Sequence, residues 1–246
     1  MHDFDFLEPT SVAEASRLLA ELGEDCRVIA GGTALMLGMR QRMLAPTHLV
    51  SLAGIDALRG LDFDPVRGLR IGALVRHAEL AASPLVSHHY PVLAGMAQRM
   101  ANPQVRNQGT VGGNLCYADP STDPPGCLMA LGATLTLRRS DKTRTVSLDK
   151  FYTGLKQTVL QAGEFIEAVV LPKPQAGQVF RAHKVSKRFE QDISAVCAAI
   201  SCELDTHYVA HNVRIAFGGM AAIPKRAKYA EAILEGQQLT ADLIVL

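Results

Sequence analysis

The 246-residue sequence has no tryptophan, no CxxC pair and no apolar run of membrane-spanning length. A transmembrane helix needs about 20 apolar residues in succession, so no helical membrane span is expected. The N-terminal segment MHDFDFLEP carries acidic residues where a signal peptide requires a basic and then an apolar run. These absences predict a cytoplasmic protein, whereas the lack of tryptophan alone excludes nothing.

Strong charge of either sign is also missing, because 25 Lys and Arg oppose 24 Asp and Glu, for a formal net charge of +1. Without a basic run, the electrostatic footprint of a nucleic-acid-binding protein is absent. The five cysteines include no Cys/His cluster, which argues against structural zinc or an iron–sulfur cluster held by this chain. An odd cysteine count without a secretion signal predicts reduced thiols.

Helical and β-like segments along the chain predict two α+β domains with a boundary near residue 175. Ser11 and Glu14 have capping-box spacing at the start of an expected helix that stops at Gly23. Residues 26–52 follow the order strand, glycine-rich turn, helix and strand. A helix is expected to begin at Pro224, and LTADLIVL at 239–246 is expected to lie in another helix. Four β-rich runs after residue 163 predict a meander-like arrangement: EFIEAVVLP, VFRAHKVS, ISAVCAAISCEL and NVRIAFGG.

Two glycine-rich segments, AGGTAL at 30–35 and GTVGGN at 109–114, are candidates for binding an anion. Backbone N–H groups approach a phosphate closely only where no Cβ intervenes. Thr33 and Thr110 add hydroxyl groups and Asn114 adds an amide. A helix that opens directly after the first loop would direct its N-terminal dipole toward the same anion. Two such loops facing each other would suit a pyrophosphate.

Neither segment is a standard nucleotide-binding motif, because the sequence contains no GxGxxG and no GxxxxGK[ST]. A single GG pair, such as Gly31-Gly32 or Gly112-Gly113, is by itself interpreted as a turn. Two GG pairs beside threonines, with Asp123 ahead of an expected helix, favour a ligand. We find no Ser/His/Asp arrangement that predicts hydrolysis, and we expect neither a catalytic residue nor a metal ligand in this chain.

The stretch RNQGTVGGNLCYADPSTDPP resembles the signature of the FAD-binding subunit of the molybdenum hydroxylases, which include xanthine dehydrogenase and carbon monoxide dehydrogenase. VIAGGTALMLGMR, FRAHKVSKRFEQDISAV and RIAFGGMAAIPKRA resemble further landmarks of this family in the same order. The resemblance implies an α+β fold: a p-cresol methylhydroxylase-type FAD-binding domain at 1–175, with subdomains at about 1–55 and 56–175. A smaller α+β C-terminal domain at 176–246 would follow, shorter than is usual in the family.

The resemblance also implies which residues contact the FAD. The first loop would surround the pyrophosphate and the second would press main chain and hydroxyl groups against the cofactor. The implied set is Val28, Ile29, Ala30, Gly31, Gly32, Thr33, Ala34, Leu35, Met100, Thr110, Gly112, Gly113, Asn114, Asp123, Ile166 and Lys184.

Four members of this set also have a plainer interpretation. Asp123 would bind the adenosine side of FAD, or it would cap a helix N-terminus, or both. Met100 would lie near the isoalloxazine and Ile166 would touch the cofactor through main chain, although spacing alone places both in the core. Lys184 would stabilise negative charge on the reduced flavin, whereas lysines in strands usually extend to solvent.

By resemblance, the chain is the FAD-carrying electron-transfer subunit of an oxidoreductase complex. A small partner subunit would supply electrons from two [2Fe–2S] clusters, and a large partner would hold the molybdenum cofactor. Such heterotrimers often pair into a dimer of trimers. Two alternatives are a stand-alone FAD-dependent oxidoreductase, disfavoured by the absence of an acid/base cluster, and an assembly protein that has lost FAD, disfavoured by the intact glycine loops. Neither the organic substrate nor the final acceptor is encoded in this chain.

Overall fold

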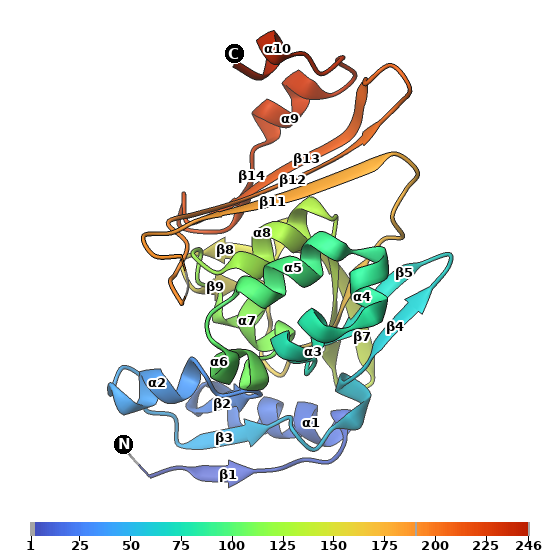
Figure 1. Ribbon diagram of the computed structural model, residues 1–246. Coiled ribbons are helices and arrows are strands. Elements are labelled where there is room, and N and C mark those ends of the chain that lie inside the picture. The colour runs from blue at the N-terminus through green and yellow to red at the C-terminus, as the bar shows by residue number, and fades with distance from the viewer. Residues whose placement is uncertain (1–2, 190, 246) are drawn as a thin grey trace.

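A small parallel sheet forms the N-terminal part of the protein (Figure 1), whose computed structural model describes residues 3–189 and 191–245. The strands lie in the order β1-β3-β2 and are all parallel. The Ser11 hydroxyl accepts a hydrogen bond from the Glu14 N–H at 3.2 Å, and the first helix ends at Gly23, as expected. The elements are β1 (Asp5–Leu7), α1 (Val12–Leu22), β2 (Cys26–Ile29), α2 (Leu35–Arg40) and β3 (His48–Ser51).

A five-stranded antiparallel sheet of order β4-β5-β10-β6-β7 lies at the centre. Its middle strand, β10, is buried along nearly its whole length, because Phe165 packs toward the N-terminal unit while Ile166 and Val169 pack into the main core. A strand covered on both faces has a mostly apolar sequence, and FIEAVVL is apolar apart from Glu167, which pairs with Arg138 at 2.6 Å. The strands are β4 (Leu61–Asp64), β5 (Gly68–Gly72), β6 (Thr134–Arg139), β7 (Lys142–Ser147) and β10 (Phe165–Leu171).

Six short helices cover one side of the central sheet. Proline occupies the first turn of α4, α5, α6 and α8, where its missing N–H leaves no helical hydrogen bond unmade. Every residue of α8 is buried, so this helix is enclosed by the protein. The elements are α3 (His77–Ala82), α4 (Pro84–His89), α5 (Pro91–Arg99), α6 (Pro103–Gln108), α7 (Val111–Tyr117), α8 (Asp123–Ala130), and the hairpin of β8 (Tyr152–Gly154) and β9 (Gln157–Thr158).

A second antiparallel sheet, of order β11-β12-β13-β14, lies on α8 at the opposite side of the molecule from β1 to β3 (Figure 1). The four β-rich runs therefore do not form one meander: the first is β10 of the central sheet, and only the other three follow one another. The helix expected at Pro224 begins at Lys228 instead, because Lys225 and Arg226 pair with β13 as a short edge strand. The elements are β11 (Gln178–Val185), β12 (Val196–Leu204), β13 (Ala210–Gly218), β14 (Lys225–Arg226), α9 (Lys228–Leu234) and α10 (Ala241–Val245).

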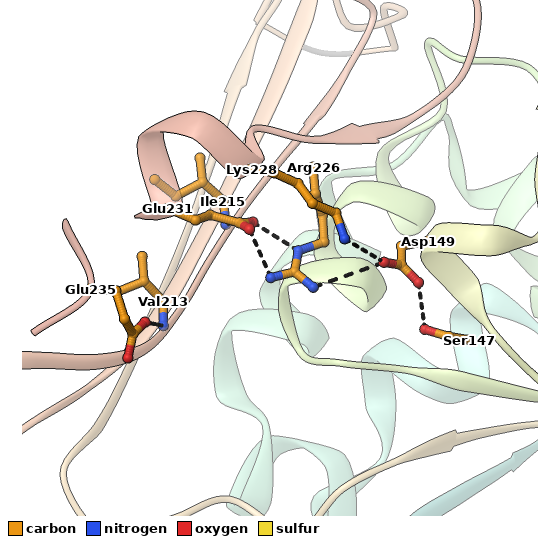
Figure 2. Close-up of polar contacts among 8 residues, drawn as sticks. All are labelled: Ser147, Asp149, Val213, Ile215, Arg226, Lys228, Glu231 and Glu235. Carbon is orange, nitrogen blue, oxygen red and sulfur yellow. Dashed lines mark hydrogen bonds and ion pairs between the residues drawn. The ribbon is translucent and has the colours of Figure 1, made fainter. Parts of the chain in front are cut away.

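Carboxylates complete the edge of β13 where the short β14 leaves it uncovered, as Figure 2 shows. Glu231 accepts the Ile215 N–H at 2.9 Å and, through both oxygens, the Arg226 guanidinium at 2.8 Å. Glu235 accepts the Val213 N–H at 2.9 Å. Arg226 also reaches 3.9 Å from Asp149 of the central part, so it links the C-terminal sheet to the rest of the chain.

Candidate FAD site

The first glycine loop follows strand β2 and leads directly into α2. Val28 and Ile29 end the strand, and Ala30, Gly31, Gly32 and Thr33 form the turn before Ala34, the N-cap of α2, and Leu35, its first residue. Gly32 has a φ of 71°, a conformation that favours glycine. The helix thus opens directly after the loop, as expected.

The second glycine segment runs beside the segment that follows β5, and it is a loop only in part, because Gly112, Gly113 and Asn114 form the first turn of α7. The His77 N–H donates to the Gly109 carbonyl at 3.0 Å, and the Gly112 N–H donates to the Ala73 carbonyl at 2.9 Å. A Cβ on Gly112 would come within 2.7 Å of the Ala73 Cβ, so only glycine fits there. Thr110 is the N-cap of α7, and its hydroxyl accepts the Gly113 N–H at 3.1 Å. The Thr110 hydroxyl oxygen is therefore already used to cap the N-terminus of α7.

The two loops touch through main chain (Figure 1, β2–α2 beside α6 and α7). A Cβ on Gly31 would overlap the carbonyl oxygen of Gln108. A Cβ on Gly113 would meet the Thr110 hydroxyl at 2.8 Å and the Ala30 Cβ at 3.9 Å. Side chains at these glycines would therefore fill the space between the loops. The structure brings together the two segments that the sequence predicted to face each other.

Asn114 adds an unpaired acceptor to the second loop. Its Oδ1 atom is buried and has no hydrogen-bond partner, although its backbone N–H donates to the Thr110 carbonyl at 2.9 Å. Buried polar atoms are nearly always paired, so an unpaired one calls for a donor from elsewhere. Glycine-lined main chain with one unpaired buried oxygen fits a bound dinucleotide.

Asp123 lies at the boundary between the central part and the C-terminal sheet, and only 5% of it is exposed. Lys184 Nζ donates to its Oδ2 at 2.9 Å, and Ser194 Oγ makes a short hydrogen bond to its Oδ1. Cys197 Sγ donates to its carbonyl oxygen at 3.9 Å. We call these four residues the Asp123 cluster.

The geometry of the Asp123 cluster corrects one prediction and links two others. Thr122, not Asp123, is the N-cap of α8, because Asp123 is the first helical residue and its carboxylate turns toward Lys184. Lys184 does not extend to solvent. Asp123 and Lys184 were expected on the adenosine and flavin sides of the cofactor, yet they are in direct contact.

A cavity of about 210 Å³ opens beside the Asp123 cluster, between α5 and β11. Its lining combines apolar side chains with both members of the buried ion pair. The lining includes Val92, Met96, Arg99, Asp123, Lys184 and Cys197.

The other expected contacts are buried near this region. Met100, 7% exposed, ends α5, and Ile166, 2% exposed, lies in β10, against which α7 packs. Both belong to the main core, as spacing alone suggested. Ser194 was missed from the sequence, because a single serine ahead of a strand gives no signal of its partner 71 residues away.

Two titratable groups close to the second segment are buried, His77 beside Gly109 and Tyr152. Burial lowers the pKa of His77 to about 4, so this side chain is neutral near pH 7. Burial raises the pKa of Tyr152, whose hydroxyl has no hydrogen-bond partner. Within the described ranges no cluster of His, Cys, Asp and Glu has the geometry of a metal site, and no helix is long and apolar enough to cross a membrane.

Comparison with known families accounts for both parts of the chain. The family described as "FAD binding domain in molybdopterin dehydrogenase" matches residues 2–174, and "CO dehydrogenase flavoprotein C-terminal domain" matches residues 181–245. The chain belongs to the FAD-binding medium subunits of the molybdenum hydroxylases. This medium subunit is accordingly part of an FAD-dependent oxidoreductase, and the predicted fold class is confirmed.

Individual relatives agree with this assignment. The medium subunit is 32% identical over 241 residues to the carbon monoxide dehydrogenase medium chain of Hydrogenophaga pseudoflava, covering 98% of this chain and 83% of that one. It is 30% identical over 241 residues to the xanthine dehydrogenase FAD-binding subunit of Escherichia coli O157:H7, covering 97% and 82%.

Solved structures give the same picture. The carbon monoxide dehydrogenase of H. pseudoflava superimposes with a TM-score of 0.94 at 32% identity, covering 99% of this chain and 84% of that one. Quinoline 2-oxidoreductase of Pseudomonas putida 86 superimposes with a TM-score of 0.88 at 30% identity, covering 98% of this chain and 83% of that one.

Proposed function

We propose that this chain binds FAD along its two glycine loops and serves as the electron-transfer subunit of a molybdenum hydroxylase complex. The observation that carries the proposal is the main-chain contact of Gly31 with residues 108–109, beside the unpaired Asn114 oxygen. The pyrophosphate would lie against the first loop, where backbone N–H groups and the start of α2 offer partial positive charge. The N–H groups of Gly112 and Gly113 are already donated within the chain, so the second segment would contribute its glycine surface.

The flavin end of the cofactor is assigned to the Asp123 cluster. Lys184 supplies a cation whose charge is held by Asp123, and Met96 and Val92 supply apolar surface on the same cavity. A flavin exchanges one or two electrons, while the protein supplies binding, orientation and electrostatics. We thus assign Asp123 to the flavin side of the cofactor, whereas the resemblance suggested the adenosine side.

Partner subunits complete the proposed reaction. A small subunit with two [2Fe–2S] clusters would deliver electrons to this chain, and a large subunit with the molybdenum cofactor would hydroxylate the substrate. The names of the relatives support a multi-subunit assembly, since they are called medium chains or FAD-binding subunits. The five free cysteines support a reducing compartment, so we propose the cytoplasm as its location.

Flavin content tests the proposal directly. We expect the purified full chain to be yellow and to release one FAD per chain on acid treatment. A colourless, folded protein that takes up no FAD would overturn the proposal. Purification from its natural source should also bring down iron- and molybdenum-containing chains. A chain that binds FAD, purifies alone and oxidises an organic substrate by itself would instead be a stand-alone oxidoreductase.

A further inference from the structure

Ser194 is a buried residue whose hydroxyl is directed at the carboxylate that pairs with Lys184. It is 3% exposed and lies two residues before β12. The next residue, Ala195, donates its N–H to the Val185 carbonyl at 2.9 Å, so the segment is tied to the end of β11 beside Lys184. The serine is therefore held by its own backbone, independently of Asp123.

Asp123 is held from two sides by different chemistry. A carboxylate rotates about its Cβ–Cγ bond, and its two oxygens move together. Ser194 contacts Oδ1 and Lys184 contacts Oδ2, so fixing the first oxygen sets the direction of the second. Lys184 pairs in register with Cys197 on β12, the strand that Ser194 precedes. The cation and the serine thus reach Asp123 from neighbouring strands.

We propose that Ser194 is a positioning residue for the flavin site: by holding Asp123 it fixes Lys184 at the edge of the cavity. This inference rests on the proposed FAD-binding function. Lys184 has a flexible side chain, and it lines the cavity with its ammonium held by Asp123 at 2.9 Å. Without the serine hydroxyl, the carboxylate would turn with the lysine and the positive charge would spread over several positions.

The matched pair of variants is Ser194→Ala and Ser201→Ala. Ser201 is also a buried serine of the C-terminal sheet, 1% exposed, and its hydroxyl accepts a hydrogen bond from Gln178 at 3.0 Å. It does not line the cavity. Both substitutions remove a buried hydroxyl that bonds to a side chain, but only the first touches the Asp123 cluster.

The measurements are the FAD dissociation constant and the flavin midpoint potential of the full chain with FAD. We expect Ser194→Ala to weaken FAD binding by about tenfold, since a hydrogen bond to a charged group is lost. The midpoint potential should become more negative, because a less localised cation stabilises the reduced flavin less. Ser201→Ala should leave both values at wild type. The flavin midpoint potential distinguishes the two roles of Ser194, because a purely structural role would not change it.

A double-mutant cycle with Asp123→Asn tests whether the serine acts through the carboxylate. In the Asp123→Asn background, removing the Ser194 hydroxyl should cause little further change. A folded Ser194→Ala variant with unchanged affinity and potential, or effects that simply add to those of Asp123→Asn, would overturn the inference. If Ser194→Ala does not fold, Ser194→Cys carries the test, because it keeps the shape with a weak donor.

FAD binding by the wild-type chain distinguishes failure of the proposed function from failure of the inference about Ser194. If wild type takes up no FAD, the proposed function fails and the role of Ser194 falls with it. If wild type binds FAD and Ser194→Ala matches it, only the inference about Ser194 fails.

Discussion

At the glycine-loop end of the site, residues 30–33 and 108–113 meet through main chain. The Asp123 end is built instead from charged and polar side chains buried between the central part and the C-terminal sheet. The loop end offers backbone N–H groups of the first loop, and beside the second segment it buries His77, whose pKa is lowered to about 4 by burial. The other end places one cation and one anion in contact.

This difference determines what each end tolerates. Main-chain contact depends on the absence of Cβ atoms, so any side chain is harmful there whatever its charge. A buried ion pair depends on charge balance, so a substitution of equal size is harmful if it leaves one partner alone. Four predictions test this contrast, taken from the largest expected effect to the smallest.

The largest effect is expected for Gly31→Val. Its Cβ would overlap the Gln108 carbonyl oxygen, so the loops must separate. We expect FAD content to fall at least about tenfold, because the loops would no longer share one pyrophosphate. FAD released per mole of folded protein measures it. Gly126→Ala is the control: a Cβ there meets no atom closer than 3.8 Å, and FAD content should stay normal. Full FAD content in folded Gly31→Val would show that the loops do not bind the pyrophosphate together.

The buried ion pair is tested by Lys184→Met, which keeps length and removes charge. Asp123 would remain 5% exposed without its cation, so we expect a loss of about 3 kcal/mol in the free energy of unfolding. Urea titration at pH 7 measures it. Adding Asp123→Asn should restore part of the loss, because the uncompensated charge is then gone. A double variant less stable than Lys184→Met would show that charge balance does not govern this end.

The same contrast explains what could be predicted from sequence. Glycine pairs beside threonines mark sites where a backbone must be approached, so the loops at 30–35 and 109–114 are recognisable from their residues alone. Strand alternation and the helix start at Ser11 also come from local sequence. These features need information from only a few neighbouring residues.

Contacts between distant segments were not predictable in this way. The Asp123–Lys184 and Asp123–Ser194 pairs span 61 and 71 residues, and no local pattern specifies them. Strand β10 was placed with the later runs because its sequence resembles theirs, while its partners β5 and β6 are fixed by packing. The helix expected at Pro224 begins at Lys228 because Lys225 and Arg226 pair with β13.

His77 sharpens the contrast because it is a titratable group that is buried at the loop end, beside Gly109. Its pKa is about 4 when folded and near 6.5 when unfolded, so between these values the unfolded state binds more protons. Stability must therefore fall as the pH drops below about 6.5. We expect the titration of His77 to lower the free energy of unfolding by about 2 kcal/mol when the pH falls from 7.5 to 5. His77→Gln should remove that part of the pH dependence in urea titrations, while the exposed His207→Gln should not. Parallel pH profiles for wild type and His77→Gln would contradict this account.

The smallest effect concerns the second contact between the C-terminal sheet and the rest of the chain, at Asp149 (Figure 2). Burial raises the pKa of this carboxyl, but hydrogen bonds from Ser147 and Lys228 and the nearby Arg226 together lower it by more, so the net shift is downward. The charged form thus stabilises the fold at neutral pH, and this contribution is lost as the pH falls through the folded pKa.

Asp149→Asn should therefore lower the free energy of unfolding by about 1 kcal/mol at pH 7. In acid its stability should approach that of wild type. Glu21→Gln, which breaks the exposed pair with Arg17, is the control and should change stability by at most about 0.5 kcal/mol. We expect FAD affinity to stay unchanged in Asp149→Asn, because Asp123 and Ser194 hold Lys184 without help from Arg226. If FAD binding weakens together with stability, the flavin end depends on how the whole C-terminal sheet is seated and not on the Asp123 cluster alone.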